Sequence, residues 1–474
     1  MKAVELENVS FRYDKNGEDI LKNIDFSIEY GSLVLLSGVS GSGKSTLLSL
    51  ICGIIPEMIK GEIKGNIKIN GKSTQNLTMS EKCSQIGVVL QNADLQILND
   101  IVEDELAFGM ENIGMPCEQI NETIENVCKT LDIDRLAKTR VLSGGQKQRI
   151  ITGSILAMGQ KILILDEPLA NLDFKASYLL MNKLKQLADS GYAVIIIEHR
   201  IDMLKSFVDN IFHMENGRLE RVENISDYYE KNKKEIPIHT IRNNREEKII
   251  SINNLSITKG KKNILDNISF DIFKGEKLLI LGENGAGKTT LVRCISRLIK
   301  TKKGVINQYI DEKIGARASK EWYRKVGVVY QNPNYQLFMP TVYQEVLFGA
   351  KNKDFGEKII KLFRLEHLLD RHPQSLSEGQ KRLVSIASVC ASDPKVLVLD
   401  EPTVGQDYDG LNRLVNILNE IHNLTHNTII TITHDKRCAK AFCDRCIEIK
   451  NGKYVKEGDI NYLDRYFSNQ NLDN

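Results

Sequence analysis

The sequence has no apolar run of the roughly 18 to 20 residues that a helix needs to span a bilayer. Its first residues, Met1-Lys2-Ala3-Val4-Glu5, lack the apolar core of a signal peptide. Neither charge is in excess, because 64 Lys and Arg residues face 62 Asp and Glu residues, so no strong field favours nucleic acid or an anionic membrane. We therefore expect a cytoplasmic chain with no membrane insertion and no nucleic-acid partner.

Cysteine is scarce and scattered, and no pair of CxxC motifs has the arrangement of a metal finger. The one cluster, Cys438, Cys443 and Cys446, is conceivable as a metal or redox site, but we interpret it as small buried residues on a terminal helix and strand. The remaining composition, 42% hydrophobic and 27% charged residues, is typical of a globular protein. At 474 residues the chain is long enough for about two to four domains.

The second half of the chain repeats the first. Four landmarks recur in the same order at offsets of 234 to 244 residues. They are Lys44 and Lys288, Gln91 and Gln331, Ser143 and Ser377, and His199 and His434. A repeat this long indicates duplicated domains. Residues 223–247 are charged, poor in apolar periodicity and interrupted by Pro237, so we predict domains at 1–222 and 248–474 joined by this linker.

Each half alternates short apolar runs with longer helical patterns. Leu33-Val34-Leu35-Leu36 is one such run, and residues 162–165 and 194–197 are two others. Continuous apolar runs of this length are typical of buried, mostly parallel strands. The sequence therefore predicts an α/β fold in each half.

Each half also contains a phosphate-binding motif, GxxxxGK[ST], after an apolar strand and before a helical pattern. Glycines let backbone N–H groups close around phosphate oxygens, the lysine reaches the outer phosphates, and Ser45 or Thr289 supplies a hydroxyl to Mg²⁺. The expected nucleotide-binding residues are Gly38, Ser40, Gly41, Gly43, Lys44, Ser45 and Thr46 in the first half, and Gly282, Asn284, Gly285, Gly287, Lys288, Thr289 and Thr290 in the second.

A carboxylate pair follows a later apolar strand in each half, Asp166-Glu167 in the first and Asp400-Glu401 in the second. Carboxylates at the end of a strand suit a metal-bound phosphate. We expect the aspartates to hold Mg²⁺ and the glutamates to polarise the water that attacks the γ-phosphate.

Between these motifs lie Leu142-Ser143-Gly144-Gly145-Gln146 and its counterpart at residues 376–380, LSEGQ. LSGGQ resembles the signature of ATP-binding cassette (ABC) ATPases, and the resemblance covers nearly all of both halves. It implies two tandem ABC-type P-loop nucleotide-binding domains, each with a RecA-like α/β core, a β-rich subdomain and a helical signature subdomain. It also implies ATP and Mg²⁺ as cofactors.

Other elements of this family fall in the same order. Gln91 and Gln331 match the Q-loop, which contacts nucleotide and Mg²⁺, and His199 and His434 match the switch histidine. Residues 171–173 and 405–407 match the D-loops. Tyr13 lies where the family places an aromatic residue against adenine.

ABC domains form head-to-tail dimers, so the resemblance implies composite sites made by the two halves of one chain. One site would combine Lys44, Ser45, Gln91, Asp166, Glu167 and His199 with Ser377, Gly379 and Gln380. The other would combine Lys288, Thr289, Gln331, Asp400, Glu401 and His434 with Ser143, Gly144, Gly145 and Gln146.

Each composite site departs from the family pattern at one position. Lys259 replaces the aromatic residue of the second half, and Glu378 replaces a signature glycine. Glu378 should weaken closure of the first site unless its carboxylate points away. Since both glutamates and both histidines are retained, our hypothesis is two hydrolysis-competent sites of unequal rate.

Residues 91–109 and 331–349 look like the Q-loop and following helix of energy-coupling factor (ECF) transporter ATPases, QNPxxQLF…TVxxEVAFG. In that family the region forms a groove for a coupling helix of the transmembrane component. The resemblance implies an importer motor on the inner face of the cell membrane, with a transmembrane coupling (T) and a substrate-binding (S) component as partners. Its cargo would be a vitamin, a vitamin precursor such as that of thiamine, or a transition-metal ion.

Three alternatives remain open. The chain could be a soluble tandem ATPase acting on ribosomes, but those proteins carry a basic helical insertion, and the recycling type also carries an iron–sulfur region. It could be a DNA-repair ATPase, but these insert coiled coils or zinc modules within the cassette. The apolar residues after each Q-loop could also do no more than pack the helical subdomain.

Overall fold

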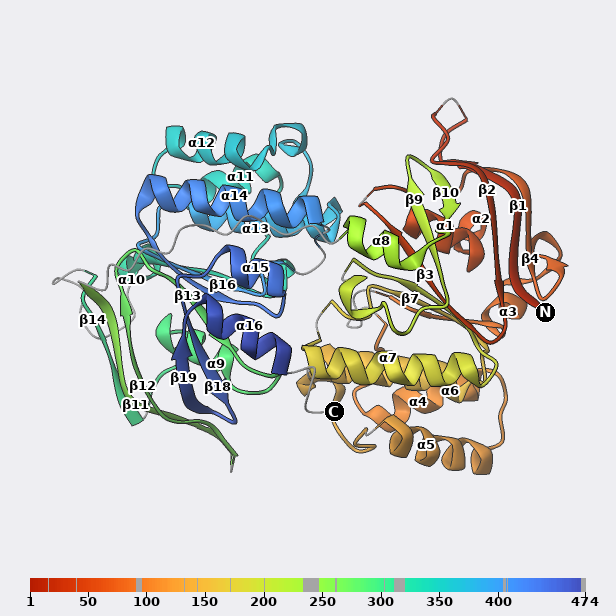
Figure 1. The fold of residues 1–474 in the computed structure, drawn as a ribbon, viewed down its shortest axis with the longest axis horizontal. Coiled ribbons are helices and arrows are strands. Elements are labelled where there is room, and N and C mark those ends of the chain that lie inside the picture. Colours follow the sequence, from red (N-terminus) through yellow and green to blue (C-terminus); the bar gives the residue numbers. More distant parts are fainter. Residues whose placement is uncertain are drawn as a thin grey trace. The chain divides into compact units, whose positions relative to one another are not determined.

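The computed structural model describes residues 1–15, 17–39, 41–90, 96–131, 133–142, 144–170, 172–199, 201–232, 247–260, 262–301, 303–310, 320–403, 406 and 408–469. Several residues singled out by the sequence lie outside this part, namely Ser40, Gln91–Leu95, Ser143, Asn171, Gly405 and Asp407. The chain forms two compact units, Met1–Lys234 and Glu235–Asn474. Both follow the same order of major strands and helices, which agrees with the duplication seen in the sequence (Figure 1).

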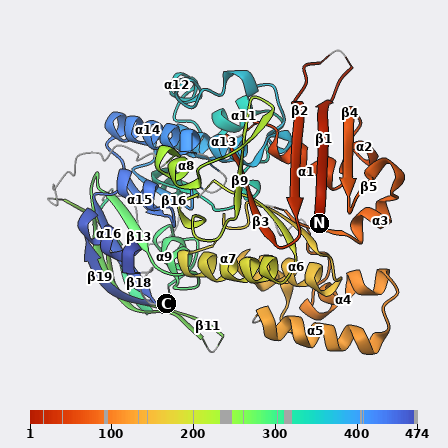
Figure 2. The same cartoon turned by 45° about the vertical axis from the view of Figure 1, so that its right-hand side comes forward.

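The first unit begins with a small antiparallel sheet. Its strands β1 (Lys2–Arg12), β2 (Leu21–Glu29), β4 (Glu62–Ile69) and β5 (Lys72–Ser73) pair in the order β2-β1-β4-β5. Figure 2 shows β2, β1 and β4 side by side. Alternate residues of β2, including Ile24, Phe26 and Ile28, are buried, as the two-residue period of a strand with one covered face requires.

A larger sheet carries the C-terminal strand ends where the motifs lie. Its order is β10 (Arg218–Arg221), β9 (Asn210–Glu215), β3 (Ser32–Gly38), β8 (Ala193–Ile197), β7 (Ile162–Asp166) and β6 (Ile86–Val89). All neighbours are parallel except β9 and β10. The predicted apolar runs are indeed buried strands, because both faces of this sheet are covered.

Helices complete the first unit. They are α1 (Lys44–Ile51), α2 (Ile54–Glu57), α3 (Met79–Cys83), α4 (Val102–Asn112), α5 (Cys117–Leu131), α6 (Gly144–Ala157) and α7 (Phe174–Asp189). α1 packs between the small sheet and one face of the larger sheet, and α7 packs on the other face. α4, α5 and α6 share a separate core around Leu106, Ile124 and Ile150, and Figure 1 shows them grouped together.

Helix α8 (Ile225–Asn232) lies inside the segment that the sequence suggests is a linker. Tyr229 is only 3% exposed and belongs to the core around α7. The Tyr228 hydroxyl hydrogen-bonds with Ser37 Oγ at 2.5 Å and His213 Nδ1 at 2.9 Å. The first unit therefore extends past residue 222. The charged residues of α8 hid the buried Tyr229 and the half-buried Tyr228 from a prediction based on composition.

The second unit repeats this plan. A three-stranded sheet has the order β12 (Lys262–Phe273), β11 (Lys248–Lys259) and β14 (Lys303–Gln308). A six-stranded sheet has the order β15 (Val326–Val329), β16 (Val396–Asp400), β17 (Thr428–Ile432), β13 (Lys277–Leu281), β18 (Arg445–Lys450) and β19 (Lys453–Gly458).

The helices of the second unit correspond to those of the first. They are α9 (Lys288–Ile295), α10 (Lys320–Lys325), α11 (Val342–Phe348), α12 (Lys353–Phe363), α13 (Glu378–Ala391), α14 (Tyr408–Thr425), α15 (Lys436–Ala441) and α16 (Ile460–Asn469). Figures 1 and 2 both show α11 to α14 as one group. Among the described residues, no helix combines the length and the apolarity that a membrane crossing requires.

The burial of Tyr229 predicts that α8 is part of the first domain. Tyr229→Ala should lower the free energy of unfolding by about 3 kcal/mol, because removal of a buried aromatic ring leaves a cavity. Urea denaturation of the full chain measures this. Glu230→Ala, on the exposed side of the same helix, is the control and should change stability little. Equal effects of the two changes would contradict the packing of α8.

Candidate functional site

The phosphate-binding loop of the first unit joins β3 to α1. Gly38 and Gly43 have φ angles of +143° and +109°, which non-glycine residues rarely adopt. A Cβ atom at Gly38 would lie 2.2 Å from the backbone oxygen of Met214, so only glycine fits at the end of this strand. The buried Lys44 Nζ donates to the carbonyl oxygens of Gly38 and Val39, both at 2.8 Å. The lysine thus holds the loop closed around its own ammonium group.

The second unit builds the same loop. A Cβ atom at Gly282 would lie 2.3 Å from the backbone oxygen of Ile449. Lys288 Nζ donates to the carbonyl oxygens of Gly282 at 2.7 Å and Glu283 at 2.9 Å. The ammonium group, the helix N-terminus and the loop together form a positively polarised cradle that fits phosphate.

The two aspartates lie at the carboxyl ends of equivalent strands, β7 and β16. Burial raises the pKa of Asp166 to about 6, and repulsion from Glu167 adds to this, whereas Lys44 opposes it. Burial also raises the pKa of Asp400, although a hydrogen bond from Thr289 works against that shift. Asp400 Oδ1 is buried without a partner among the described residues. Hydroxyl and carboxylate oxygens are ligands that Mg²⁺ prefers, so Thr289 and Asp400 fit the expected ion.

The next residue in each unit turns the chain sharply. Glu167 and Glu401 have φ angles of +49° and +51°, a conformation that costs a non-glycine residue about 1 kcal/mol or more. The Glu167 N–H donates to Ile197 O and the Glu401 N–H to Ile432 O, each at 2.9 Å. These bonds hold each glutamate against the neighbouring strand.

This turn brings each glutamate to the expected histidine. His199 Nε2 lies 3.2 Å from Glu167 Oε1, and His434 Nε2 lies 3.4 Å from Glu401 Oε1. His434 Nε2 also lies 3.3 Å from Lys288 Nζ and 3.2 Å from Asn284 Oδ1. The structure thus brings together side chains that the sequence places up to 150 residues apart.

The residue before each histidine has a role that the sequence does not reveal. Glu198 is buried, and its carboxylate accepts hydrogen bonds from the N–H groups of Leu169 at 2.8 Å and His199 at 2.9 Å. In the second unit Thr433 stands at this position and contacts Thr403 Oγ1 at 3.2 Å. The residue before the histidine is therefore a glutamate in the first unit and a threonine in the second.

The second signature motif caps a helix. Ser377 Oγ accepts from the Gln380 N–H at 3.3 Å, and Gln380 Oε1 accepts from the Ser377 N–H at 3.1 Å, which is a complete capping box. The Glu378 carboxylate pairs with Lys381 at 3.1 Å on its own helix. In the first unit Gly145 packs so tightly against Leu172 that a Cβ atom would lie 2.5 Å from Leu172 Cδ2.

Tyr13 lies beside the first phosphate-binding loop. Its hydroxyl is 3.1 Å from Thr46 Oγ1, and its ring packs edge-on against Phe11 at 4.8 Å. Tyr13 is 45% exposed. The exposed Lys259 ends strand β11 of the second unit.

A glutamine a few residues after each Q-loop glutamine bonds to the backbone of the strand end before it. Gln96 donates to Val88 O at 2.9 Å and accepts from the Leu90 N–H at 2.7 Å. Gln336 makes the equivalent bonds to Val328 at 2.6 Å and Tyr330 at 2.9 Å.

The buried glutamate of the following helix closes the end of this segment. Glu105 Oε2 accepts from the N–H groups of Leu98 at 3.0 Å and Asn99 at 2.8 Å. Glu345 Oε2 accepts from those of Phe338 and Met339, both at 2.8 Å. Although both halves repeat these residues, the sequence alone assigns them no structural role.

These bonds leave apolar side chains exposed on both units. Leu98 and Phe108 are 69% and 43% exposed in the first unit. Tyr335, Phe338 and Phe348 are 75%, 65% and 67% exposed in the second, and the two phenylalanine rings meet at 5.4 Å. We call these sets the exposed apolar faces. The packing alternative fits Leu337, which is 4% exposed, but not the members of these faces.

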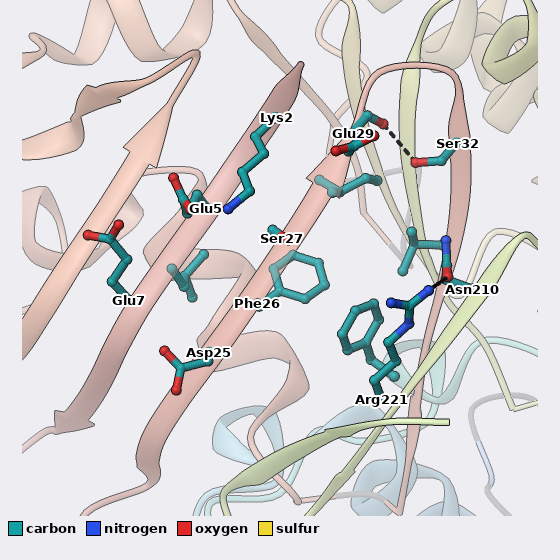
Figure 3. A pocket seen from close by; sticks show the side chains of 14 residues that line it. Lys2, Glu5, Glu7, Asp25, Phe26, Ser27, Glu29, Ser32, Asn210 and Arg221 are labelled. Carbon is teal, nitrogen blue, oxygen red and sulfur yellow. Dashed lines mark hydrogen bonds and ion pairs between the residues drawn. The ribbon is translucent and has the colours of Figure 1, made fainter. Parts of the chain in front are cut away.

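A cavity of about 690 Å³ lies elsewhere in the first unit, between the small sheet and strands β3, β9 and β10 (Figure 3). Lys2, Glu5, Glu29, Ser32, Asn210 and Arg221 are among its lining residues. In the second unit Arg445 stands at the position of Asn210, and its side chain is 4% exposed. It bonds to both oxygens of Glu276, to Glu457 and to the backbone oxygen of Asp271. None of the residues that the sequence assigns to nucleotide lines this cavity.

A family model described as ABC transporter matches residues 21–170 and 265–404. The chain belongs to this family. The matched ranges contain both phosphate-binding loops, both signature motifs and both Asp-Glu pairs. The predicted tandem ABC fold is thereby confirmed, and this ABC protein is an ATPase that binds and hydrolyses ATP.

Relatives of similar length match nearly the whole chain. A protein of Treponema denticola, whose name describes an ABC transporter ATP-binding protein, is 32% identical over 96% of this chain and 96% of its own. A protein of Bacillus subtilis, whose name describes an HMP/thiamine import ATP-binding protein, is 32% identical over 96% of this chain and 91% of its own.

Solved structures of tandem ABC proteins resemble this ABC protein in fold. Archaeal ABCE1 in a ribosome-bound model with Pelota is 19% identical, covers 98% of this chain and 80% of its own, and gives a TM-score of 0.74. The archaeal ribosome recycling factor aABCE1 with stalk protein aP1 is 18% identical, covers 98% and 92%, and gives a TM-score of 0.67. At these identities the likeness concerns the fold alone.

The buried Asp166 predicts a conflict between stability and metal binding. A carboxyl whose folded pKa lies near 6, above its ordinary 3.8, loses stabilising free energy as the pH rises through that range. Asp166→Asn should therefore raise the free energy of unfolding of the Mg²⁺-free protein by about 2 kcal/mol above pH 7, and by less as the pH falls from 6 towards 4.

Urea denaturation at pH 5 and pH 8 in the presence of a chelator measures this effect. Asp189→Asn, at the exposed end of α7, is the matched control and should show no such dependence. A gain for Asp166→Asn that is the same at both pH values would contradict the assignment.

Proposed function

We propose that this ABC protein is the ATP-hydrolysing motor subunit of an ECF-type importer. The observation that carries the proposal is the pair of exposed apolar faces. Each face follows a Q-loop and is held by a buried glutamate, Glu105 or Glu345, which fixes the backbone beneath it. An apolar patch on a rigid support, next to a nucleotide site, suits a docked helix of a membrane partner.

The nucleotide chemistry follows from the residues of each unit. Lys44 and Lys288 bind the outer phosphates, while Ser45, Thr289, Asp166 and Asp400 hold Mg²⁺. The ion neutralises phosphate charge when bound.

Glu167 and Glu401 accept a proton from the attacking water, and His199 and His434 orient them. The Q-loop glutamines, Gln91 and Gln331, link this chemistry to the exposed apolar faces.

Composite sites explain how hydrolysis produces motion. Ser377, Gly379 and Gln380 complete the first site, and Ser143, Gly144, Gly145 and Gln146 complete the second. ATP gains these contacts only when the two domains close, so binding shifts the equilibrium towards closure and hydrolysis reverses it. The pairing of Glu378 with Lys381 keeps its carboxylate on its own helix, which supports a working first site. We infer two active sites of unequal rate.

Transport places the chain on the cytoplasmic face of the membrane, bound to a T and an S component. The substrate is chosen by the S component, a separate chain. The HMP/thiamine name of the Bacillus subtilis relative supports a vitamin precursor as the cargo. A transition-metal ion is the other cargo that the ECF resemblance implies.

A ribosome-associated role is the second candidate, favoured by the fold likeness to ABCE1. Two features stand against it. The segment between α8 and β11 is only 15 residues long, from 233 to 247, which is too short for a basic helical insertion. The exposed apolar faces also have no role in that alternative.

Co-purification from native membranes tests the proposal. Wild-type chain should recover a small multispanning protein and a larger coupling protein, identified by mass spectrometry. Phe338→Asp combined with Leu98→Asp should abolish this recovery, because a buried charge opposes docking of an apolar helix. Recovery of ribosomal proteins without membrane proteins would overturn the transport assignment.

A matched control separates lost docking from unspecific damage. Tyr309→Asp changes a 55% exposed aromatic residue outside the exposed apolar faces. It should retain the membrane partners. Basal ATP turnover should remain in all three chains.

A further inference from the structure

Helix α13 of the second unit reaches from the signature motif to the segment around Gln331. Arg382 Nη1 donates to the carbonyl oxygen of Tyr330, the residue directly before Gln331, at 2.9 Å. One turn further along α13, Ser385 Oγ donates to Gln336 Oε1 at 2.9 Å. Gln336 in turn holds the backbone at Val328 and Tyr330. Signature helix and Q-loop segment are thus joined by side chains of one helix.

The first unit carries different side chains at these two positions. The offset that relates the two signature motifs places Gln148 opposite Arg382 and Ile151 opposite Ser385. Ile151 has no polar atom and is buried in the apolar core. Gln96 nevertheless makes the same bonds to the backbone of Val88 and Leu90 that Gln336 makes in the second unit. What differs is the pair of side chains that the signature helix carries at these positions.

Burial of the Arg382 side chain costs free energy of folding. Its side chain is 4% exposed, and Nε has no partner among the described residues. Burial lowers the pKa of Arg382 to about 10, although Glu401, Glu378 and Asp400 lie close enough for their charges to oppose that shift. The guanidinium is therefore charged at neutral pH. A buried cation with so few bonds costs stability, which suggests a functional reason for its presence.

We propose that Arg382, supported by Ser385, is a positioning residue of the second ATP site, which fixes the Q-loop backbone before Gln331 and ties it to the signature helix α13. The inference rests on the ATPase activity and the Q-loop role given above. Arg382 acts through the Q-loop backbone and not by contact with the nucleotide or the attacking water. Arg382 thereby links the exposed apolar face of the second unit to α13 and to the Asp400-Glu401 pair.

Steady-state ATPase measurements test this in a Glu167→Gln background, which leaves the second site as the source of turnover. Arg382→Gln introduces the residue of the first unit and should lower kcat about tenfold through misplacement of the Q-loop. KM for ATP should change by no more than about twofold, since the phosphate-binding loop is untouched. Arg382→Lys should restore part of kcat, because a cation still reaches towards Tyr330.

A second comparison avoids the buried charge. Ser385→Ala removes the bond to Gln336, while Ser388→Ala removes only a bond within the helix, to Ser385 O. Ser385→Ala should lower kcat and speed hydrogen exchange of residues 328–336, and Ser388→Ala should do neither. Thermal unfolding of each variant reports folding.

Two results distinguish a failure of the positioning role from a failure of the proposed ATPase activity at the second site. If folded Arg382→Gln and Ser385→Ala chains keep the kcat and exchange rates of their parent, Arg382 has no positioning role. If the Glu167→Gln parent itself has no turnover above a Glu167→Gln/Glu401→Gln chain, the assignment of an active second site fails instead.

Discussion

The sharp turn at the carboxyl end of strands β7 and β16 is the constraint on which both candidate sites depend. Glu167 and Glu401 adopt a positive φ there, and a bond to the neighbouring strand holds each in place. The turn places a carboxylate beside the histidine of that strand while the preceding aspartate stays near the lysine of the phosphate-binding loop. Backbone strain of this kind is retained where function requires the geometry. The surrounding buried strands supply the rigidity.

Much of this arrangement could be predicted from the sequence because its signals are local. A phosphate-binding loop needs glycines at fixed spacing, and the apolar runs that precede Gly38 and Asp166 are continuous, so strand, loop and helix follow directly. The end of the first domain is harder to predict from the sequence than the motifs are. Helix α8 is charged on one side and buries Tyr229 on the other. Its packing partners lie far away in the sequence, which composition cannot reveal.

The supports of the sites could not be predicted for the same reason. Glu345 looks like an ordinary helical glutamate until its carboxylate is seen to accept two backbone N–H groups. Arg382 looks like a surface residue of a signature helix, yet it is buried. Asn210 and Arg445 occupy equivalent positions, but only the fold shows that Asn210 borders a cavity and that Arg445 is buried and bound to Glu276. Such roles depend on contacts between distant segments.

The duplicated domains thus share a framework and differ in what surrounds it, and on this basis we propose two active sites of unequal rate. Phosphate release by chains carrying Glu167→Gln, Glu401→Gln or both tests this central claim most directly. Each single variant should retain part of the turnover, in unequal amounts, and the double variant should retain almost none. Undiminished turnover in Glu167→Gln together with complete loss in Glu401→Gln would show that the first site only holds nucleotide and would contradict the account.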